Sequence, residues 1–268
     1  MKTYPKLLII AGSDSGGGAG IQADIKSAGA CGTYSTTVIT ALTAQNTLGV
    51  SAIEGVSPQM ISAQLKAVLE DIGTDAVKIG MLHSKEVIEV IAKHLKYYQP
   101  KSVVLDPVMV ATSGDRLLKE EAMQALMETM IPLAEVITPN VPEMQLLLGE
   151  NIENTTEFSE YAKALAEKFQ VSVLLKAGHL EGEHSTDILF NIKSKQLTKL
   201  SSPRIDTKNT HGTGCSLSSA LGSYLAQGFS LEEAAQKAKA FIHQAIKAGS
   251  TYRLGGGSGP IHHFYNDK

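Results

Sequence analysis

Cysteine and clustered positive charge are both scarce in this chain. Its 268 residues include only Cys31 and Cys215, and no C-x-x-C pair occurs. This argues against a disulfide framework and favours a reducing compartment. The formal net charge is −3, and the lysines and arginines are scattered rather than grouped. Because a nucleic-acid groove needs clustered positive charge, we expect no nucleic-acid partner.

Long apolar runs are missing as well. No stretch approaches the roughly 18 apolar residues of a membrane-spanning helix, so we expect no membrane partner. Near the N-terminus only five apolar residues precede Gly12. That run is too short for the apolar region of a secretory signal. Together with the cysteine content, these absences predict a cytoplasmic protein.

Short apolar runs of strand length alternate with segments of helical period. Strands are predicted at 7–11, 36–40, 76–79, 103–105, 136–137 and 171–175, and helices at 20–30, 58–72, 87–95, 213–227 and 230–249. Residues 185–200 are predicted to form an antiparallel pair. The alternation predicts an α/β fold whose central sheet is mostly parallel, with helices on both faces. Since no linker, charge block or repeat interrupts it, we predict one domain over 1–268.

Polar and glycine clusters follow several of the predicted strands. They are Gly12-Ser13-Asp14, Asp106-Pro107, Thr138-Pro139-Asn140 and Lys176-Ala177-Gly178. Open parallel sheets bind ligands outside the carboxyl ends of their strands. The four clusters therefore predict one binding cleft along that edge of the sheet.

The first glycine-rich motif spans residues 12–20 and precedes a predicted helix. Glycines let backbone N–H groups approach a ligand closely, and a helix start attracts anions. The motif lacks the Gly-Lys-Ser/Thr ending of a P-loop. A dinucleotide-binding fingerprint fits poorly, because its third glycine would fall at Ile21. A flexible strand-to-helix turn remains the simpler alternative.

The second glycine motif is Thr210-His211-Gly212-Thr213-Gly214-Cys215, at the start of a predicted helix. Its backbone N–H groups from residue 212 to 215 can converge on one point at the positive end of the helix dipole. Such an anion hole suits a transferring phosphoryl group. A helix N-terminus also lowers the pKa of a thiol, so Cys215 is predicted to be a proton acceptor. The alternative is a small buried hydrophobic residue.

Taken together, these motifs resemble the ribokinase superfamily, and within it the hydroxymethylpyrimidine (phosphomethylpyrimidine) kinases of thiamine biosynthesis. The resemblance lies in residues 12–24, 38–47, 78–82, 106–109, 138–143, 209–215 and 259–263. It implies a three-layer ribokinase-like fold and a homodimer. It also implies transfer of phosphate from ATP, with Mg²⁺, to 4-amino-5-hydroxymethyl-2-methylpyrimidine and then to its monophosphate.

The resemblance also assigns residues to the substrate side of the site. Gln45 would hydrogen-bond the aminopyrimidine, since an amide both donates and accepts. Gly12, Asp24 and Met81 would line the same pocket. The simpler alternatives are a helix-surface charge for Asp24 and core packing for Met81.

On the phosphate side, the resemblance implies that Gly212, Thr213, Gly214 and Cys215 hold the transferring group. Asp106 and Glu143 would hold Mg²⁺, and the nucleotide would contact Asn140, Lys176, Asp187 and Lys239. A first-turn helix carboxylate is the alternative for Glu143. His211 is predicted to shape its loop rather than to catalyse.

Two rival functions stay open at this stage. A pyridoxine or pyridoxal kinase of the same branch has overlapping motifs and a substrate with the same hydroxymethyl group. A non-catalytic vitamin sensor on the same fold is the rival of another class, although Asp106, Glu143, Lys176 and Cys215 are all present. The sequence also permits a lid at Val110–Leu118.

Overall fold

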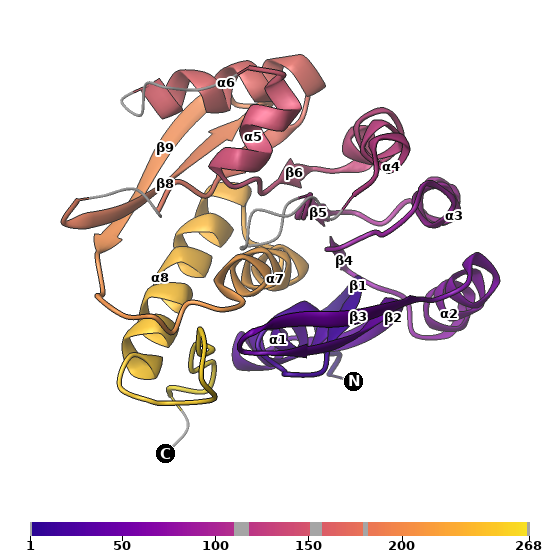
Figure 1. Ribbon diagram of the computed structural model, residues 1–268. Helices are drawn as coiled ribbons and strands as arrows, with labels where there is room; N and C mark the ends of the chain where they lie inside the picture. Colours follow the sequence, from indigo (N-terminus) through magenta and orange to yellow (C-terminus); the bar gives the residue numbers. More distant parts are fainter. Residues whose placement is uncertain (1, 110–117, 151–156, 179–181, 267–268) are drawn as a thin grey trace.

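The computed structural model of the chain describes residues 2–109, 118–150, 157–178 and 182–266. A nine-stranded sheet with the order β3-β2-β1-β4-β5-β6-β7-β8-β9 runs through them (Figure 1). Its strands are β1 (Lys6–Asp14), β2 (Tyr34–Asn46), β3 (Gly49–Gly55), β4 (Ala76–Ile79), β5 (Val103–Leu105), β6 (Val136–Ile137), β7 (Ser172–Leu175), β8 (His184–Asn191) and β9 (Gln196–Pro203). The segment predicted as a lid lies outside the described residues, except for Leu118.

The sheet is parallel in its centre and antiparallel at both edges. Strands β2, β1, β4, β5, β6 and β7 pair in parallel, whereas β3, β8 and β9 join by antiparallel pairing. The parallel strands read as continuous apolar runs because helices cover both of their faces. The predicted mostly parallel sheet and the antiparallel pair near 185–200 are confirmed.

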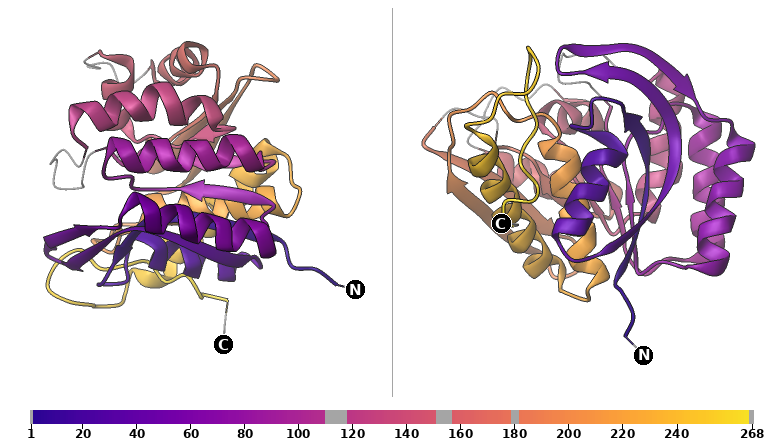
Figure 2. Two further views of the ribbon diagram at one scale, coloured as in Figure 1. Left: turned by 90° about the vertical axis from the view of Figure 1, so that its right-hand side faces the viewer. Right: turned by 90° about the horizontal axis from the view of Figure 1, so that it is seen from below.

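Helices cover the sheet on both sides and give three layers (Figures 1 and 2). One layer contains α2 (Pro58–Asp71), α3 (Lys85–Tyr98), α4 (Glu120–Ala125), α5 (Val141–Leu148) and α6 (Phe158–Phe169). The opposite layer contains α1 (Gly20–Ala30), α7 (Thr213–Ala226) and α8 (Leu231–Gly249). A π turn at Leu126–Met130 and a 3₁₀ turn at Ile131–Leu133 continue α4. The predicted three-layer fold is confirmed.

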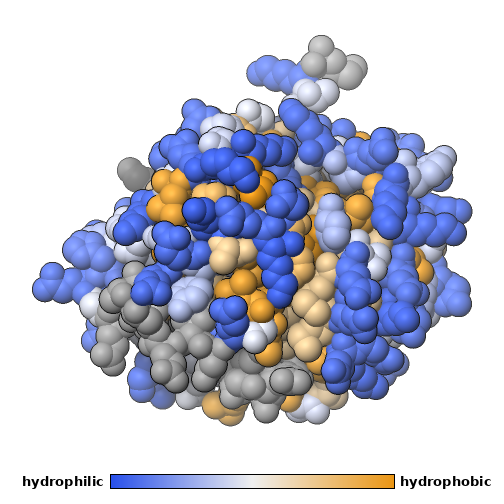
Figure 3. Space-filling model, turned by 90° about the horizontal axis from the view of Figure 1, so that it is seen from above, coloured by the Kyte–Doolittle hydropathy of each residue, from blue (hydrophilic) through white to orange (hydrophobic). Residues whose placement is uncertain are grey.

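Helix α3 illustrates how the sequence sets these layers. Ser84 caps it by accepting a hydrogen bond from the backbone N–H of Val87. Buried Val87, Ile91 and Leu95 recur at helical spacing, so one face of the helix packs on the sheet. The outer faces are polar, and Figure 3 shows a mainly hydrophilic surface with apolar side chains gathered in a narrow strip. None of the described helices is long and apolar enough to span a bilayer.

The sequence reasoning missed one strand and three helices. Strand β2 runs well beyond the predicted 36–40 and continues into β3, whose seven residues are all exposed. Because β3 has no buried face, it lacks the alternation that marks a strand in sequence. Helices α4, α5 and α6 were not predicted either. The right-hand view of Figure 2 shows the β2–β3 hairpin curving beside the C-terminal segment.

Candidate active site

The first glycine loop is organised by Asp14, at the end of β1. This carboxylate is buried and accepts hydrogen bonds from the backbone N–H groups of Gly16, Gly18 and Ala19 at 2.8, 3.0 and 2.8 Å. Burial opposes ionisation of Asp14, but these bonds and His211 outweigh it and lower its pKa. The loop is therefore folded around a fixed negative charge rather than left as a flexible turn.

The two glycine motifs lie in contact. His211 Nε2 lies 3.1 Å from Asp14 Oδ2 and ties the second loop to the first. Gly212 has a φ of 82°, and a Cβ there would overlap the carbonyl oxygen of Gly18. Only glycine combines this left-handed backbone with so close an approach. The proximity of residues 210–215 to residues 12–20, on which the kinase interpretation depends, is confirmed.

A cationic cradle forms at the start of α7. Gly212 is the N-cap, and the N–H of Thr213 donates to the carbonyl of Thr210 at 3.2 Å, whereas those of Gly214 and Cys215 have no preceding helical turn to bond. Lys176, at the end of β7, places its Nζ 3.3 Å from the position of a Cβ on Gly214. An ammonium thus stands beside N–H groups at the positive end of a helix dipole. This arrangement suits an anion with several oxygens.

Two carboxylates share the Lys176 ammonium. Its Nζ lies 2.6 Å from Asp106 Oδ1 and 4.0 Å from Glu143 Oε2, and all three side chains are buried. Burial raises the pKa of Glu143 above its usual range, although Lys176 opposes this. Burial lowers the pKa of Lys176, but the two carboxylates more than offset it, so the net shift is upward. The group therefore carries one uncompensated negative charge when both acids are ionised.

Further hydrogen bonds hold the two acids in place. Thr138 Oγ1 donates to Asp106 at 3.1 Å. Asn140 and Glu143 form the capping box of α5, each accepting the other's backbone N–H at 2.8 Å. The backbone N–H of Met109 donates to the other Glu143 oxygen at 3.2 Å. Glu143 is thus the first-turn helix carboxylate of the simpler interpretation, and it also faces Lys176.

Two side chains predicted to contact the nucleotide form an ion pair farther along the same edge. Lys239 Nζ lies 2.8 Å from Asp187 Oδ2 and donates to Ser185 Oγ at 3.1 Å. The other Asp187 oxygen accepts the backbone N–H of Gly178 at 3.2 Å. Gly178 follows Lys176 by two residues. The pair therefore lies next to the loop that carries the cradle lysine.

Three of the residues predicted to bind substrate belong to neighbouring strands of the sheet: Gln45 lies in β2, Gly12 lies in β1 and Met81 follows β4 by two residues. The Met81 methyl group lies 2.8 Å from the position of a Cβ on Gly12. Gln45 exchanges two hydrogen bonds of 2.8 Å between its backbone and the Ser15 hydroxyl. Its side-chain oxygen accepts from Thr43 at 3.2 Å. The glycine loop thus fixes Gln45 in position.

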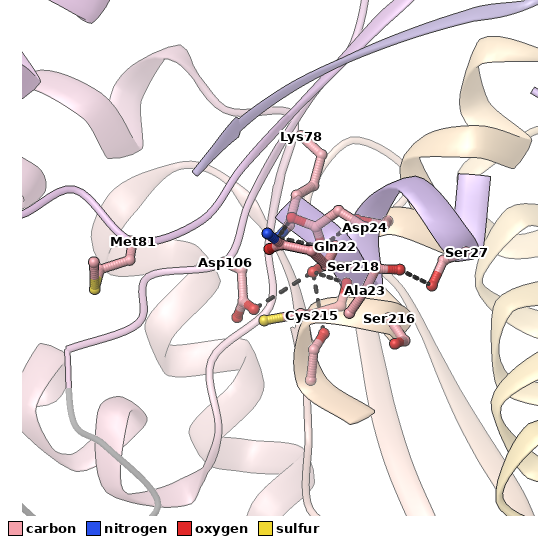
Figure 4. A network of polar contacts seen from close by, with 12 residues as sticks. Gln22, Ala23, Asp24, Ser27, Lys78, Met81, Asp106, Cys215, Ser216 and Ser218 are labelled. Carbon is pink, nitrogen blue, oxygen red and sulfur yellow. Dashed lines mark hydrogen bonds and ion pairs between the residues drawn. The ribbon is translucent and has the colours of Figure 1, made fainter. Parts of the chain in front are cut away.

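Asp24 is placed differently from a residue that lines a pocket or a helix surface. Its side chain has no exposed area, and both oxygens lie 2.8 Å from Lys78 Nζ. Ser219 Oγ donates to Asp24 at 2.7 Å. Figure 4 shows this group close to Cys215. The sequence offered a signal for Lys78, because a lysine inside an apolar strand needs a buried partner.

The prediction that the helix N-terminus lowers the pKa of Cys215 is wrong. Burial raises the pKa of the thiol to about 11, although Lys78 opposes the shift. Desolvation of the thiolate thus outweighs the attraction of Lys78 and the hydrogen bond from Gly20. The backbone N–H of Gly20 is hydrogen-bonded to the cysteine, which places its side chain against the first glycine loop.

A three-layer fold with such a cradle at the carboxyl edge of its sheet defines a phosphotransferase of the ribokinase-like class. The family model described as phosphomethylpyrimidine kinase matches residues 14–262. The chain belongs to the phosphomethylpyrimidine kinase family.

Similarity to known proteins extends over nearly the whole chain. A hydroxymethylpyrimidine/phosphomethylpyrimidine kinase of Rhizobium meliloti is 49% identical over 96% of this chain and 96% of its own length. A thiamine biosynthesis bifunctional protein of Geobacter sulfurreducens is also 49% identical, over 96% of this chain but 52% of its own length. The solved ADP complex of a Bacillus subtilis pyridoxal kinase is 38% identical, with a TM-score of 0.89 over 97% of this chain and 98% of that one.

Proposed function

We propose that this chain phosphorylates 4-amino-5-hydroxymethyl-2-methylpyrimidine with ATP, and then phosphorylates the monophosphate, in thiamine biosynthesis. The observation that carries the proposal is the cradle at the start of α7, with the Lys176 ammonium beside Gly214. On one side of it lie Gln45, Gly12 and Met81, at the ends of neighbouring strands. On the other side lie Asp106 and Glu143. An acceptor alcohol and a nucleotide can thus approach the cradle from opposite sides.

In the first transfer, the hydroxymethyl oxygen forms a bond to the γ-phosphorus of ATP. The bond from that phosphorus to the β–γ bridging oxygen breaks, and ADP leaves with the electron pair. Gly212, Gly214 and Lys176 stabilise the charge on the transferring group. The alcohol proton passes to the Cys215 sulfur, and the thiol must first lose its own proton because burial raises its pKa to about 11. Gln45 holds the ring so that the alcohol points at the cradle.

We further propose that Asp106 and Glu143 hold Mg²⁺ when the nucleotide binds. Magnesium commonly uses one or two carboxylates and completes its shell with water and substrate phosphates. The two buried acids fit this pattern, since they exceed the charge of Lys176 by one. The described residues contain no cluster of three acidic, histidine or cysteine side chains that could hold a metal alone. The ion would neutralise phosphate charge, while Asn140, Asp187 and Lys239 would contact the nucleotide.

The two transfers differ in their need for a proton acceptor, and this gives a sharp test. An alcohol must lose a proton, whereas a phosphate monoester dianion has none to lose at neutral pH. Cys215→Ala is therefore expected to slow the first transfer by about 100-fold or more and the second by only a few-fold. Phosphorus NMR with each substrate separately follows both steps. Equal losses in the two steps would remove Cys215 from the role of proton acceptor.

Pyridoxal phosphorylation is the competing function, because a pyridoxal kinase shares this fold closely. Measuring kcat/KM for the hydroxymethylpyrimidine and for pyridoxal in one ATP-consumption assay separates the two. The proposal predicts a higher value for the pyrimidine, and a higher value for pyridoxal would overturn it. Binding of either compound without ADP release would instead support a vitamin sensor.

We also propose that two copies of the chain pair through the β2–β3 hairpin. Leu42, Leu48, Val50 and Ile53 on this hairpin are 51%, 77%, 47% and 48% exposed, an apolar content unusual for a solvated surface. Leu48→Ser with Ile53→Ser should shift the mass measured by light scattering from two chains to one. The single domain over 1–268 and the cytoplasmic location stay predictions.

A further inference from the structure

The first glycine loop, residues 12–20, is filled by a carboxylate of its own chain. Asp14 is only 2% exposed. Its two oxygens accept hydrogen bonds from the backbone N–H groups of Gly16, Gly18 and Ala19. Neighbouring N–H groups that converge in this way form a nest for an anion. Because Asp14 already occupies the nest, a phosphate cannot use these N–H groups, and the loop must serve the reaction in another way.

One side of this loop contacts the part of the site that is proposed to hold the pyrimidine. The Ser15 hydroxyl donates to the Gln45 carbonyl and accepts the Gln45 backbone N–H, both at 2.8 Å. A Cβ on Gly16 would lie 3.2 Å from the Gln45 carbonyl oxygen, so the two backbones approach closely here. Gly16 is also one of the residues whose N–H donates to Asp14. A change in the shape of the loop therefore displaces the backbone that carries Gln45.

The other side of the loop contacts the phosphate cradle. His211 Nε2 lies 3.1 Å from Asp14 Oδ2, the oxygen that also accepts two of the loop N–H groups. Gly212, the next residue, lies so close to the loop that a Cβ on it would overlap the Gly18 carbonyl oxygen. Gly212 is also the N-cap of α7. The same carboxylate thus fixes the place where the cradle begins.

We propose that Asp14 is a positioning residue for phosphoryl transfer, whose carboxylate holds the backbone of Gln45 and the start of α7 at a fixed separation, the latter through His211. An alcohol held by Gln45 and a phosphoryl group held by the cradle must come within about 3 to 3.5 Å of each other for transfer. Asp14 acts by setting the distance between the parts that hold these groups, and not by contacting either group. The effect on turnover rests on the proposed function, whereas the linkage of the two loops does not.

Hydrogen exchange tests the linkage of the two loops without any substrate. Asp14→Asn keeps the size of the side chain but replaces one acceptor oxygen with an NH2 group, which cannot accept a hydrogen bond. Mass spectrometry of peptides should show exchange faster by about tenfold or more in residues 12–20 and also in residues 209–216. Faster exchange confined to residues 12–20 would overturn the proposal, because the second loop would then keep its place without Asp14.

Lys26→Met is the matched control for this experiment. Lys26 Nζ donates to the Gly17 carbonyl at 2.8 Å, so it holds the same loop from outside and not through Asp14. Its loss should leave exchange in residues 209–216 within about twofold of that in the unmodified protein. Circular dichroism and thermal unfolding establish that each variant is folded.

Turnover supplies the second readout. In Asp14→Asn, kcat for the first transfer should fall at least about tenfold, while KM for ATP and KM for the pyrimidine each stay within about threefold. This split is expected because each side of the site keeps its own ligand contacts and only their relative placement changes. A variant that raises either KM and leaves kcat unchanged would overturn the proposal.

Two substitutions of His211 test the link itself and decide the matter if Asp14→Asn does not fold. His211→Ala removes the donor to Asp14 and should lower kcat by about tenfold. His211→Gln should recover most of this loss, because its amide can donate to Asp14 from about the position of Nε2. Equal kcat values in the two folded variants would overturn the proposal, since the hydrogen bond to Asp14 would then have no effect on transfer.

Failure of the proposed function gives a different result. An unmodified protein that turns over pyridoxal and not the hydroxymethylpyrimidine would refute the proposed function, and the same comparison of kcat with pyridoxal would then test Asp14. A protein that turns over neither compound would refute the proposed function as well, and the exchange rates of residues 209–216 would decide whether Asp14 links the loops.

Discussion

Low pH should destabilise the folded protein through one buried histidine in the C-terminal segment. His263 is only 4% exposed, and its Nε2 lies 2.8 Å from Ser216 Oγ in the first turns of α7. Burial lowers the pKa of His263 to about 4, with small further effects from Lys26 and His262. In the unfolded chain this pKa returns to about 6.5. The unfolded state therefore binds a proton over a pH range in which the native state does not.

The sign and size of the effect follow from that difference. Stability from neutral His263 is complete above pH 6.5 and is lost as the pH falls towards 4. The gap between about 6.5 and about 4 corresponds to about 3 kcal/mol, since one pKa unit is about 1.4 kcal/mol. His263→Gln keeps a polar atom near Ser216 but cannot take up this proton. The free energy of unfolding of the His263→Gln protein should therefore fall less steeply than that of the unmodified chain as the pH is lowered.

Urea unfolding at pH 7, 6, 5 and 4.5 measures this difference. The difference in free energy of unfolding between the unmodified chain and His263→Gln should narrow by about 2 to 3 kcal/mol as the pH falls across that range. His262→Gln, at the neighbouring and partly exposed position, is the control and should follow the unmodified chain. Parallel pH profiles for the unmodified chain and His263→Gln would refute the reasoning, because both would then bind the same number of protons on unfolding.

Three further substitutions test the active site. Gly212→Ala should lower turnover by about 100-fold or more, because a Cβ there would displace the Gly18 carbonyl and the cradle; steady-state kinetics with a folded variant measures this. Gln45→Leu should raise KM for the pyrimidine by about tenfold or more and leave KM for ATP unchanged, which initial rates with each substrate varied would show. Lys176→Met should reduce kcat by about 100-fold, and it should raise the pKa of Glu143 further, observable by carbon-detected NMR titration. Retained turnover in either Gly212→Ala or Lys176→Met would contradict the cradle.

The sequence predicted the fold and the edge of the sheet that carries the site. Apolar runs such as 7–11 and 103–105 report burial directly, and parallel strands bring their carboxyl ends to one edge. The polar residues after those strands, including Asp106 and Lys176, therefore had to meet. The start of α5 was missed although it carried a local signal, since the capping box of Asn140 and Glu143 can be recognised from sequence spacing.

Contacts between segments that lie far apart in the sequence could not be predicted from apolar runs and capping patterns. Thr47, at the hairpin turn, accepts a hydrogen bond from the backbone N–H of Ser258 at 3.2 Å, and nothing local in either segment marks the other as its partner. The exposed strand β3 was missed because a strand without a buried face has no alternation of apolar and polar residues. Sequence periodicity reports what an element buries, and it does not report which element lies opposite.

Cys215 shows why position in a helix is not enough to predict reactivity. A helix N-terminus contributes at most about 2 kcal/mol to the stability of a negative charge. Cys215 is partly exposed, yet desolvation of its thiolate still raises the pKa of the thiol to about 11. A bound nucleotide would add more negative charge nearby. The charges of Lys78 and Lys176 favour the thiolate, but they do not offset its desolvation. It follows that desolvation has the largest effect on the pKa of Cys215, and that a place at the start of a helix is not enough to make it a thiolate.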